Sequence, residues 1–509
     1  MYSVIKTAVL QGIESIPVQV ETDLSEGMPV FEMVGFLASE VKEARERVRI
    51  GLLNSGVRLP ARRITVNFTP ANIRKSGSSF DLAVAASILS AMGKIRPETA
   101  QKSLFLGEVG LNGEVLPVRG ALSAAILARK EGIEYIFLPE SNKKEASVFD
   151  DLAVIPVSSL SEMIAFCSEP SPLPHAWTER EKPEPSDCEE DFSDLCGQAL
   201  VRRACEIAVS GMHNLLMIGP PGSGKTMIAK RIPSILPPLE FEEMLEISQI
   251  YALADGTGQN GGLVTRRPFR APHHTVTAQA LCGGGKNPVP GEISLAHKGV
   301  LFLDEFPEFP RNVLDTLRQP MEDKEIRVNR VGASCVFPCD FMLVAAMNPC
   351  KCGYYPDARR CRCTPASVQA YINHISQPML DRIDISVETR ELAYRELAAG
   401  RKSESSASIR ARVVRTQAIE RRRLAGRPCR YNAQMTGRDV NELCVPDRDG
   451  QKYLEGLMEE ETLSARAYYK LLKVARTIAD MEEEEMIREV HLREAAAYRT
   501  LDKKYWEAR

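Results

Sequence analysis

Eight residues near the middle of the chain have the types and spacing of a phosphate-binding loop. They are Gly219, Pro220, Pro221, Gly222, Ser223, Gly224, Lys225 and Thr226. They satisfy the pattern G-x-x-x-x-G-K-[ST] between an apolar stretch, 214–218, and a helical one, 227–231. Backbone N–H groups of such a loop converge on phosphate oxygens, Lys225 would reach the outer phosphates of ATP, and the Thr226 hydroxyl would bind Mg²⁺. A glycine-rich turn with an accidental lysine would not need both flanking elements.

Two later apolar runs end in side chains that suit phosphate hydrolysis. The run 299–303 is followed by Asp304 and Glu305, and the run 341–347 is followed by Asn348. Buried strands deliver such residues to the carboxyl edge of a sheet. There Asp304 would hold Mg²⁺ through water, Glu305 would polarise the attacking water, and Asn348 would orient that water. Taken alone, the acids also fit a solvated strand end, and the asparagine fits a turn.

Four of the 13 cysteines are bunched in two C-x-C pairs that are separated by eight residues. They are Cys350, Cys352, Cys361 and Cys363. The odd total argues for free thiols and not for a disulfide framework. Thiolates two residues apart can converge on one tetrahedral ion, for which zinc is the first choice, and Arg359 and Arg360 would help to offset their charge. The alternative is four reduced cysteines in an ordinary loop.

The positions of these motifs fall within a chain of four compositionally different stretches. Residues 1–167 alternate β-rich and helical runs, which indicates an α/β or α+β domain. The expected strands are 4–10, 64–68 and 135–138, and the expected helices are 39–55, 81–92 and 121–130. Residues 168–194, rich in proline and acid, are interpreted as a linker. Residues 195–395 have the order of a nucleotide-binding α/β layer, and 396–509 is helical.

The composition is that of an ordinary globular protein. Of the 509 residues, 44% are hydrophobic and 26% are charged, which excludes a disordered or fibrous chain and suits about three domains. The net charge of −3 means that nucleic-acid binding would need a local basic surface. Because we find neither a long apolar run nor a signal-like N-terminus, we expect a cytoplasmic protein that does not enter a membrane.

Several further segments resemble one family of proteins. Arg267 to His274, Pro290 to His297, Gly299 to Glu305 and Ala346 to Cys350 resemble the ComM (YifB) family of magnesium chelatase-like AAA+ ATPases. The resemblance implies a Lon-protease-like (ribosomal S5-like) N-terminal α+β domain, a P-loop AAA+ α/β core with a presensor-1 β-hairpin, and a helical C-terminal lid. It also implies a homohexameric DNA helicase that promotes branch migration in natural transformation.

The same resemblance suggests roles for four arginines. Arg382 lies in a segment that resembles the arginine finger, which reaches the γ-phosphate bound by a neighbouring subunit, and Arg466 resembles the second sensor. Arg330, with Arg327 nearby, stands just before the turn of a hairpin expected over 325–337, where such motors contact the DNA backbone. All four also fit ordinary surface charges.

The N-terminal domain is not expected to be a protease. Lon-type domains use a Ser-Lys dyad, and Ser79 lies in a segment that resembles the one around the serine. Leu122 stands where the lysine would align, so no base is evident to deprotonate Ser79. His273 and His274 are expected on an extended strand, facing opposite ways, with a structural role.

Two classes of function therefore stay open. The leading hypothesis is an ATP-driven hexameric motor on single-stranded or branched DNA, acting without sequence specificity. The alternative is a chelatase-type remodeller of a protein partner that does not touch DNA.

Overall fold

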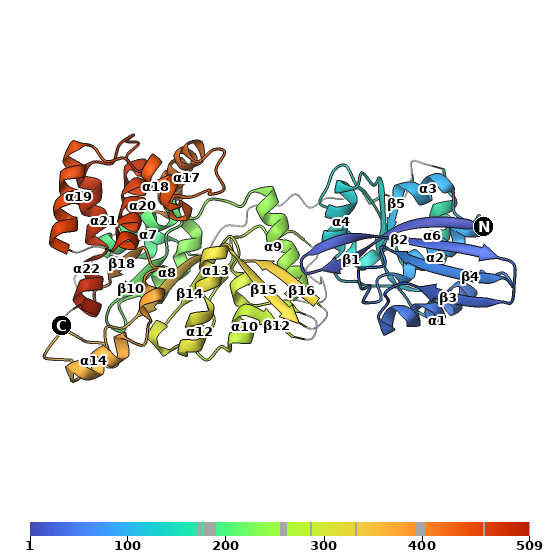
Figure 1. Ribbon diagram of the computed structural model, residues 1–509, viewed down its shortest axis with the longest axis horizontal. Helices are drawn as coiled ribbons and strands as arrows, with labels where there is room; N and C mark the ends of the chain where they lie inside the picture. Colours follow the sequence, from blue (N-terminus) through green and yellow to red (C-terminus); the bar gives the residue numbers. More distant parts are fainter. Residues whose placement is uncertain are drawn as a thin grey trace.

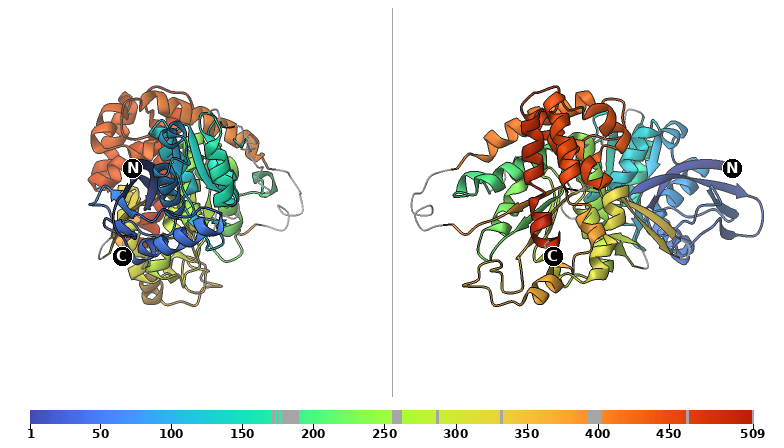
Figure 2. Two further views of the ribbon diagram at one scale, coloured as in Figure 1. Left: turned by 90° about the vertical axis from the view of Figure 1, so that its right-hand side faces the viewer. Right: turned by 60° about the vertical axis from the view of Figure 1, so that its left-hand side comes forward.

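The computed structural model describes residues 1–170, 173, 176–177, 190–254, 262–285, 288–330, 333–392, 403–461 and 464–507. The part before residue 170 forms one end of an elongated molecule (Figure 1). A parallel-sheet part follows it, and the C-terminal helices lie against one side of that part (Figure 2). The protein is thus a multidomain α/β protein.

A seven-stranded mixed sheet forms the N-terminal part. In spatial order its strands are β3 (Val30–Val34), β4 (Arg63–Thr69), β2 (Glu14–Ser25), β1 (Tyr2–Gln11), β5 (Ser103–Phe105), β8 (Tyr135–Pro139) and β9 (Ala153–Val157). Only the β1–β2 and β2–β4 pairs are antiparallel. The strands expected at 4–10, 64–68 and 135–138 are confirmed as β1, β4 and β8.

Helices cover both faces of this sheet. They are α1 (Ser39–Asn54), α2 (Asp81–Ala91), α3 (Pro97–Lys102), α4 (Ala121–Lys130), α5 (Lys143–Ala146) and α6 (Leu160–Ser168). Side chains of β8 alternate between two cores, with Phe137 packing in the core of α1, α2 and α6, and Ile136 in that of α4. Helix α2 is apolar all round, so it is almost wholly buried.

The middle part is built on a five-stranded parallel sheet. Its strands in spatial order are β11 (Phe269–Arg270), β14 (Val300–Leu303), β17 (Met342–Met347), β10 (Leu215–Ile218) and β18 (Ile385–Glu388). Leu215 packs in one core and Leu216 in another on the opposite face. Because both faces are covered, β10, β14 and β17 are continuously apolar, which is why the sequence predicted these three strands.

Several helices and a hairpin surround the parallel sheet. The helices are α7 (Ala199–Gly211), α8 (Lys225–Ile235), α9 (Phe241–Ala254), α10 (Ala278–Cys282), α11 (Glu292–Leu295), α12 (Arg311–Thr316), α13 (Arg318–Asp323), α14 (Pro365–Ile372) and α15 (Gln377–Leu380). Strands β15 (Glu325–Arg330) and β16 (Ala333–Pro338) pair antiparallel as the expected hairpin.

The described residues after 403 are organised as helices. They form α17 (Ser406–Arg423), α18 (Gly437–Leu443), α19 (Arg448–Glu461), α20 (Ala465–Met481), α21 (Glu489–Ala497), α22 (Thr500–Asp502) and the π-helical η5 (Lys503–Glu507). Residues of α17, α20 and α21 share one apolar core with α7 and one face of the parallel sheet. The C-terminal helices are therefore packed directly on the nucleotide-binding layer.

The packed middle part begins before residue 195. Phe192 is fully buried in the same core as α7, and its N–H donates to the Ser406 hydroxyl at 2.8 Å. Asp191 accepts a hydrogen bond from the backbone N–H of Ser406, and Asp194 pairs with Arg231 of α8. Residues 191–194 are thus anchored, although their acidic composition resembles that of the expected linker.

Helix α9 of the middle part contacts α4 and other residues of the N-terminal part. The Gln249 amide of α9 donates to the Ile13 carbonyl and to the Ser123 hydroxyl, both at 3.1 Å. The rings of Phe149 and Phe241 meet edge to face, with centroids 6.1 Å apart. The β15–β16 hairpin extends toward the same region (Figure 1).

We predict that Phe192→Ala lowers the free energy of unfolding by about 3 kcal/mol, because it leaves a cavity in the shared core. Urea unfolding followed by circular dichroism measures the change. The control is Leu200→Ala on α7, whose side chain is 74% exposed and should matter little. Equal stability of the two variants would mean that residues 191–194 are not part of this core.

Candidate nucleotide site and four-cysteine loop

The predicted phosphate loop connects β10 to α8. Gly222 and Gly224 have φ of +75° and +85°, a left-handed conformation that glycine adopts without strain. The loop borders an open cavity of about 380 Å³. Its lining residues are Pro221, Gly222, Ser223, Gly224, Lys225, Thr226, Met227, Asp304, Glu305, Met347 and Asn348. The structure therefore brings the predicted loop, both predicted acids and the predicted amide together.

Lys225 is held by oxygen atoms at the base of the loop. Its ammonium donates to the carbonyls of Gly219 and Pro220 at 2.8 and 3.0 Å, and to Asn348 Oδ1 at 3.0 Å. Burial lowers the pKa of Lys225 to about 8, although the Asp304 carboxylate acts in the opposite direction. The lysine is thus an easily discharged cation beside a phosphate-sized space.

Thr226 and Asp304 form a set of oxygen donors that fits Mg²⁺. The Thr226 hydroxyl donates to Asp304 Oδ2 at 2.6 Å, and the other oxygen of Asp304 accepts the backbone N–H of Glu305 at 2.9 Å. Hydroxyl and carboxylate oxygens on the rim of an open cavity are the ligands that this hard cation prefers, together with water and phosphate.

Glu305 is oriented by its backbone and by His274, for which the sequence analysis predicted only a structural role. Its φ is +52°, which is uncommon for a residue with a side chain. His274 Nδ1 lies 3.2 Å from Glu305 Oε2. The expectation that His273 and His274 face opposite ways is wrong: they lie in a turn region after β11, and their ring centroids are 4.0 Å apart.

Two further residues brace the phosphate loop, and the sequence analysis missed both. Thr389, directly after β18, shares a 2.7 Å hydrogen bond with the Ser223 hydroxyl. Gln198, just before α7, donates to the carbonyls of Ser223 and Arg390. Strand β18 reads Ile-Ser-Val-Glu and is not an apolar run, so no local signal marks Thr389, and none marks Gln198.

The predicted arginine finger, Arg382, and the predicted second sensor, Arg466, lie close together, and neither is among the described residues that line the phosphate cavity. Arg382 donates to the Arg318 carbonyl and pairs with Glu322, both on α13. Arg466 opens α20, is 68% exposed, and approaches Asp381, the neighbour of Arg382, at 3.5 Å. Both arginines thus lie outside the lining of the phosphate cavity of their own chain, Arg466 exposed and Arg382 with only 15% of its side chain exposed.

The hairpin carries the two arginines predicted to contact DNA. Arg330 is the last residue of β15 and pairs in register with Ala333, so it stands just before the turn; its side chain lies outside the described residues. Arg327 is 64% exposed and pairs with Glu325, its Nε 2.7 Å from Oε1. The positive charge of Arg327 is therefore partly neutralised by Glu325 of the same strand.

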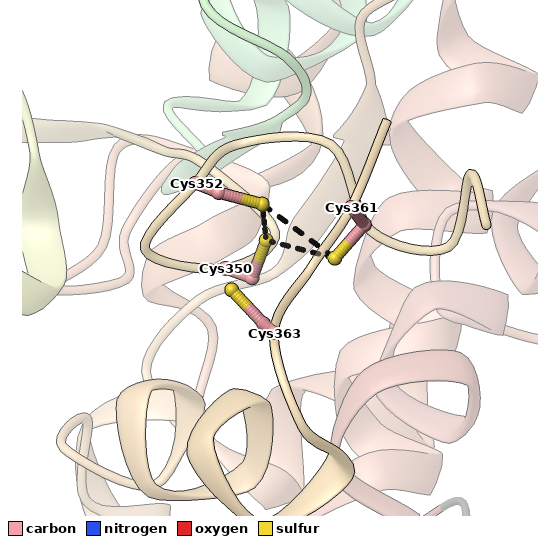
Figure 3. Close-up of side chains that lie close together, drawn as sticks. All are labelled: Cys350, Cys352, Cys361 and Cys363. Atoms are coloured by element: carbon pink, nitrogen blue, oxygen red, sulfur yellow. Dashed lines mark hydrogen bonds between the residues drawn. The ribbon is translucent and has the colours of Figure 1, made fainter. Parts of the chain in front are cut away.

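The four cysteines converge, as Figure 3 shows. All four sulfur atoms lie within 4.8 Å of one another, a set that could hold a metal ion. Backbone N–H groups, first that of Tyr354, hydrogen-bond the Cys352 sulfur and lower its pKa to about 6. Arg360 does not serve the thiolates as expected: it pairs with both oxygens of Glu391 at 2.7 and 2.8 Å and stacks on Tyr354.

Family models match the chain in three consecutive blocks. Residues 20–142 match "Subunit ChlI of Mg-chelatase", 191–397 "Magnesium chelatase, subunit ChlI", and 403–499 the C-terminal part of ChlI. The chain is 39% identical to YifB of Escherichia coli K12, across 98% of this chain and 97% of that protein. It is 40% identical to competence protein ComM of Haemophilus influenzae, across 96% of each. The chain belongs to the ComM/YifB family of magnesium chelatase-like proteins.

Membership of the ComM/YifB family indicates an AAA+-type ATPase that uses ATP and Mg²⁺. A shorter similarity, 30% identity over 173 residues, links the chain to the Lon protease of Mycolicibacterium smegmatis. Leu122, at the expected lysine position, is buried, and its N–H donates to Glu145 at 3.1 Å. In the described part of the chain, no helix combines the length and the hydropathy needed to cross a membrane.

We predict that ADP binding to this ComM/YifB protein weakens about tenfold between pH 7 and pH 9. Above its pKa of about 8, Lys225 must take up a proton to attract phosphate, and each pH unit then costs up to tenfold in affinity. Calorimetric titrations at several pH values, in buffers of different ionisation enthalpy, measure both the affinity and the proton uptake.

Lys230→Ala is the control, because Lys230 is an exposed lysine on the same helix, α8. It should keep the pH profile of the wild type. A flat profile with no proton uptake in the wild type would contradict the role of Lys225.

Proposed function

We propose that this protein is a homohexameric ATP-driven motor that translocates on DNA as a helicase or branch-migration enzyme, in natural transformation and recombination in the cytoplasm. The observation that carries the proposal is the separation of the site into two halves. Lys225, Asp304, Glu305 and Asn348 surround the phosphate cavity, whereas Arg382 does not line it and pairs with Glu322 of α13. From that position Arg382 would complete the phosphate site of a neighbouring subunit and not that of its own chain.

Each residue around the cavity has a defined task in hydrolysis. The loop N–H groups and Lys225 would bind and orient the phosphates, and Thr226 and Asp304 would hold Mg²⁺, which neutralises phosphate charge when bound. Glu305 would accept a proton from the water that attacks the γ-phosphorus, while Asn348 holds that water in line. His274 keeps the Glu305 carboxylate at the cavity edge.

The neighbouring subunit would supply the remaining charge. Arg382, released from Glu322, would place its guanidinium against the γ-phosphate and stabilise the charge that develops as the bond to the leaving group breaks. Arg466 lies beside it through Asp381, so we assign both arginines to the same interface. Binding of ATP would thereby join two subunits.

The hairpin is the part of the chain that would meet DNA. Arg330 and Arg327 on β15 would contact phosphates of a strand in the central pore, which gives affinity without sequence specificity. Support comes from the name of the ComM relative, "Competence protein", and from the position of Arg330 before the turn. A chelatase-type remodeller of a protein partner is the rival reading.

We predict that ATP hydrolysis rises severalfold when single-stranded, duplex or branched DNA is added, and that Arg330→Ala abolishes this rise but keeps basal hydrolysis. A phosphate-release assay with each DNA decides between a DNA motor and a protein remodeller. Arg438→Ala is the control, because Arg438 is an exposed arginine on α18, remote from the hairpin in sequence. An ATP hydrolysis rate that does not change with any of the three DNAs would refute the DNA-motor proposal.

We also predict that mixing two inactive variants restores activity. Arg382→Ala keeps a competent phosphate cavity and Lys225→Ala keeps a competent arginine, so a mixed ring contains some complete interfaces. Those interfaces should hydrolyse ATP, because such an arginine is worth about 10³-fold or more where it meets bound nucleotide.

Co-assembly of the two variants is verified by a tag on one of them. If no activity returns, either Arg382 acts within its own subunit or the ring needs every site at once. Dilution of wild type with Lys225→Ala separates these cases, because strict coupling makes activity fall much faster than the wild-type fraction.

A further inference from the structure

The four-cysteine loop has the geometry of a single-ion site. The Cys350 sulfur lies 3.3 Å from that of Cys352 and 3.8 Å from that of Cys361, and the last two are 3.5 Å apart. Four sulfurs at the usual Zn–S length of roughly 2.3 Å in a tetrahedron are about 3.8 Å from one another. A disulfide would require about 2.05 Å. The thiols are therefore spaced for a shared ion and not for oxidation to each other.

The ligand set selects the metal. Four thiolates are soft ligands, and once all four bind they leave no open position, which favours a structural Zn²⁺ over a catalytic one. The loop also supplies hydrogen-bond donors: the N–H groups of Tyr354 and Arg362 point to the Cys352 sulfur, and that of Cys363 to the Cys361 sulfur. Such donors around the sulfurs orient ligands of a bound metal.

The same loop touches the nucleotide site at two places. Cys350 is fully buried and follows the predicted water-orienting residue, Asn348, by only two residues. Gly353 packs against the phosphate loop so closely that a Cβ there would lie 2.4 Å from Cδ of Pro221. Pro221 is a member of the loop that lines the phosphate cavity. The cysteine loop thus packs directly against the phosphate loop.

The cysteine loop is not held in place by regular secondary structure. Between β17 and α14, a range that includes Pro349 to Cys363, the chain forms neither a helix nor a strand. Outside packing comes partly from the C-terminal segment, where the rings of Tyr355 and Tyr505 lie 6.4 Å apart. A metal that joins both ends of the stretch would supply the missing constraint, as in small zinc-stabilised loops.

We infer that Cys350, Cys352, Cys361 and Cys363 bind one structural Zn²⁺ per chain, and that this zinc holds Gly353 against Pro221 and so keeps the phosphate loop in its nucleotide-binding shape. The inference rests on the nucleotide site of the proposed function and is independent of DNA binding. It makes zinc a determinant of nucleotide affinity without giving it a part in the chemistry.

The metal arm of the test measures zinc and ADP binding on the same full-length samples. Wild type purified with reductant and without chelator should contain about one zinc per chain by elemental analysis. Cys352→Ser/Cys361→Ser should lose the zinc and bind a fluorescent ADP analogue about tenfold more weakly. Cys196→Ser, which changes a half-buried free cysteine outside the loop, should match wild type in both respects.

A second variant tests the contact without touching the ligands. Gly353→Ala should keep its zinc but lose ADP affinity, because its Cβ displaces Pro221. Gly426→Ala is the matched control: its φ of +80° is close to the +88° of Gly353, but a Cβ there meets nothing within 4 Å. Circular dichroism checks folding, and if the double cysteine variant does not fold, the Gly353 arm and the metal content of wild type decide.

Each result has a distinct meaning. Wild type that binds ADP but contains no metal, or contains iron, overturns the zinc assignment and leaves the nucleotide site intact. Zinc-containing wild type that does not bind ADP refutes the proposed function and not the metal site. Normal ADP affinity in folded, zinc-free or Gly353→Ala protein overturns the coupling between them.

Discussion

The parallel arrangement of four strands is the constraint on which the nucleotide site depends. Because β10, β14, β17 and β18 run in the same direction, the residues that follow them meet at one edge of the sheet. The phosphate loop follows β10, and Asp304, Asn348 and Thr389 follow the other three strands. Lys225 and Asn348 are 123 residues apart in sequence and 3.0 Å apart in space for this reason.

That geometry also explains how far the sequence could be read. An apolar run followed by a polar residue is a local signal, so the sequence alone predicts the phosphate loop, Asp304, Glu305 and Asn348, together with β10, β14 and β17. Gln198 and His274 reach the site from turns, and only tertiary packing brings them there. The expectation for His274 was wrong because it assumed strand geometry for a segment that turns.

Averages over a segment fail where one side chain decides the structure. The stretch 168–194 has the composition of a linker, yet Phe192 is fully buried. Asp191 accepts a hydrogen bond from the backbone N–H of Ser406, the first residue of α17. In the same way, the charge of Arg360 predicted a role beside the thiolates, but Glu391 offers a carboxylate whose two oxygens match the guanidinium fork. Pair geometry of this kind is not encoded in spacing along the chain.

The position of Arg382 links the proposed subunit interface to the hairpin. Its guanidinium makes two interactions with α13: it donates to the Arg318 carbonyl at 3.2 Å and pairs with the Glu322 carboxylate. Helix α13 ends at Asp323, and β15 begins two residues later. The hairpin therefore follows directly the helix that Arg382 contacts. In the proposed ring, a neighbour's γ-phosphate competes with Glu322 for the guanidinium. Loss of the Arg382–Glu322 pair when ATP binds, and its return after hydrolysis, would then act on α13, the helix that leads into the hairpin proposed to meet DNA.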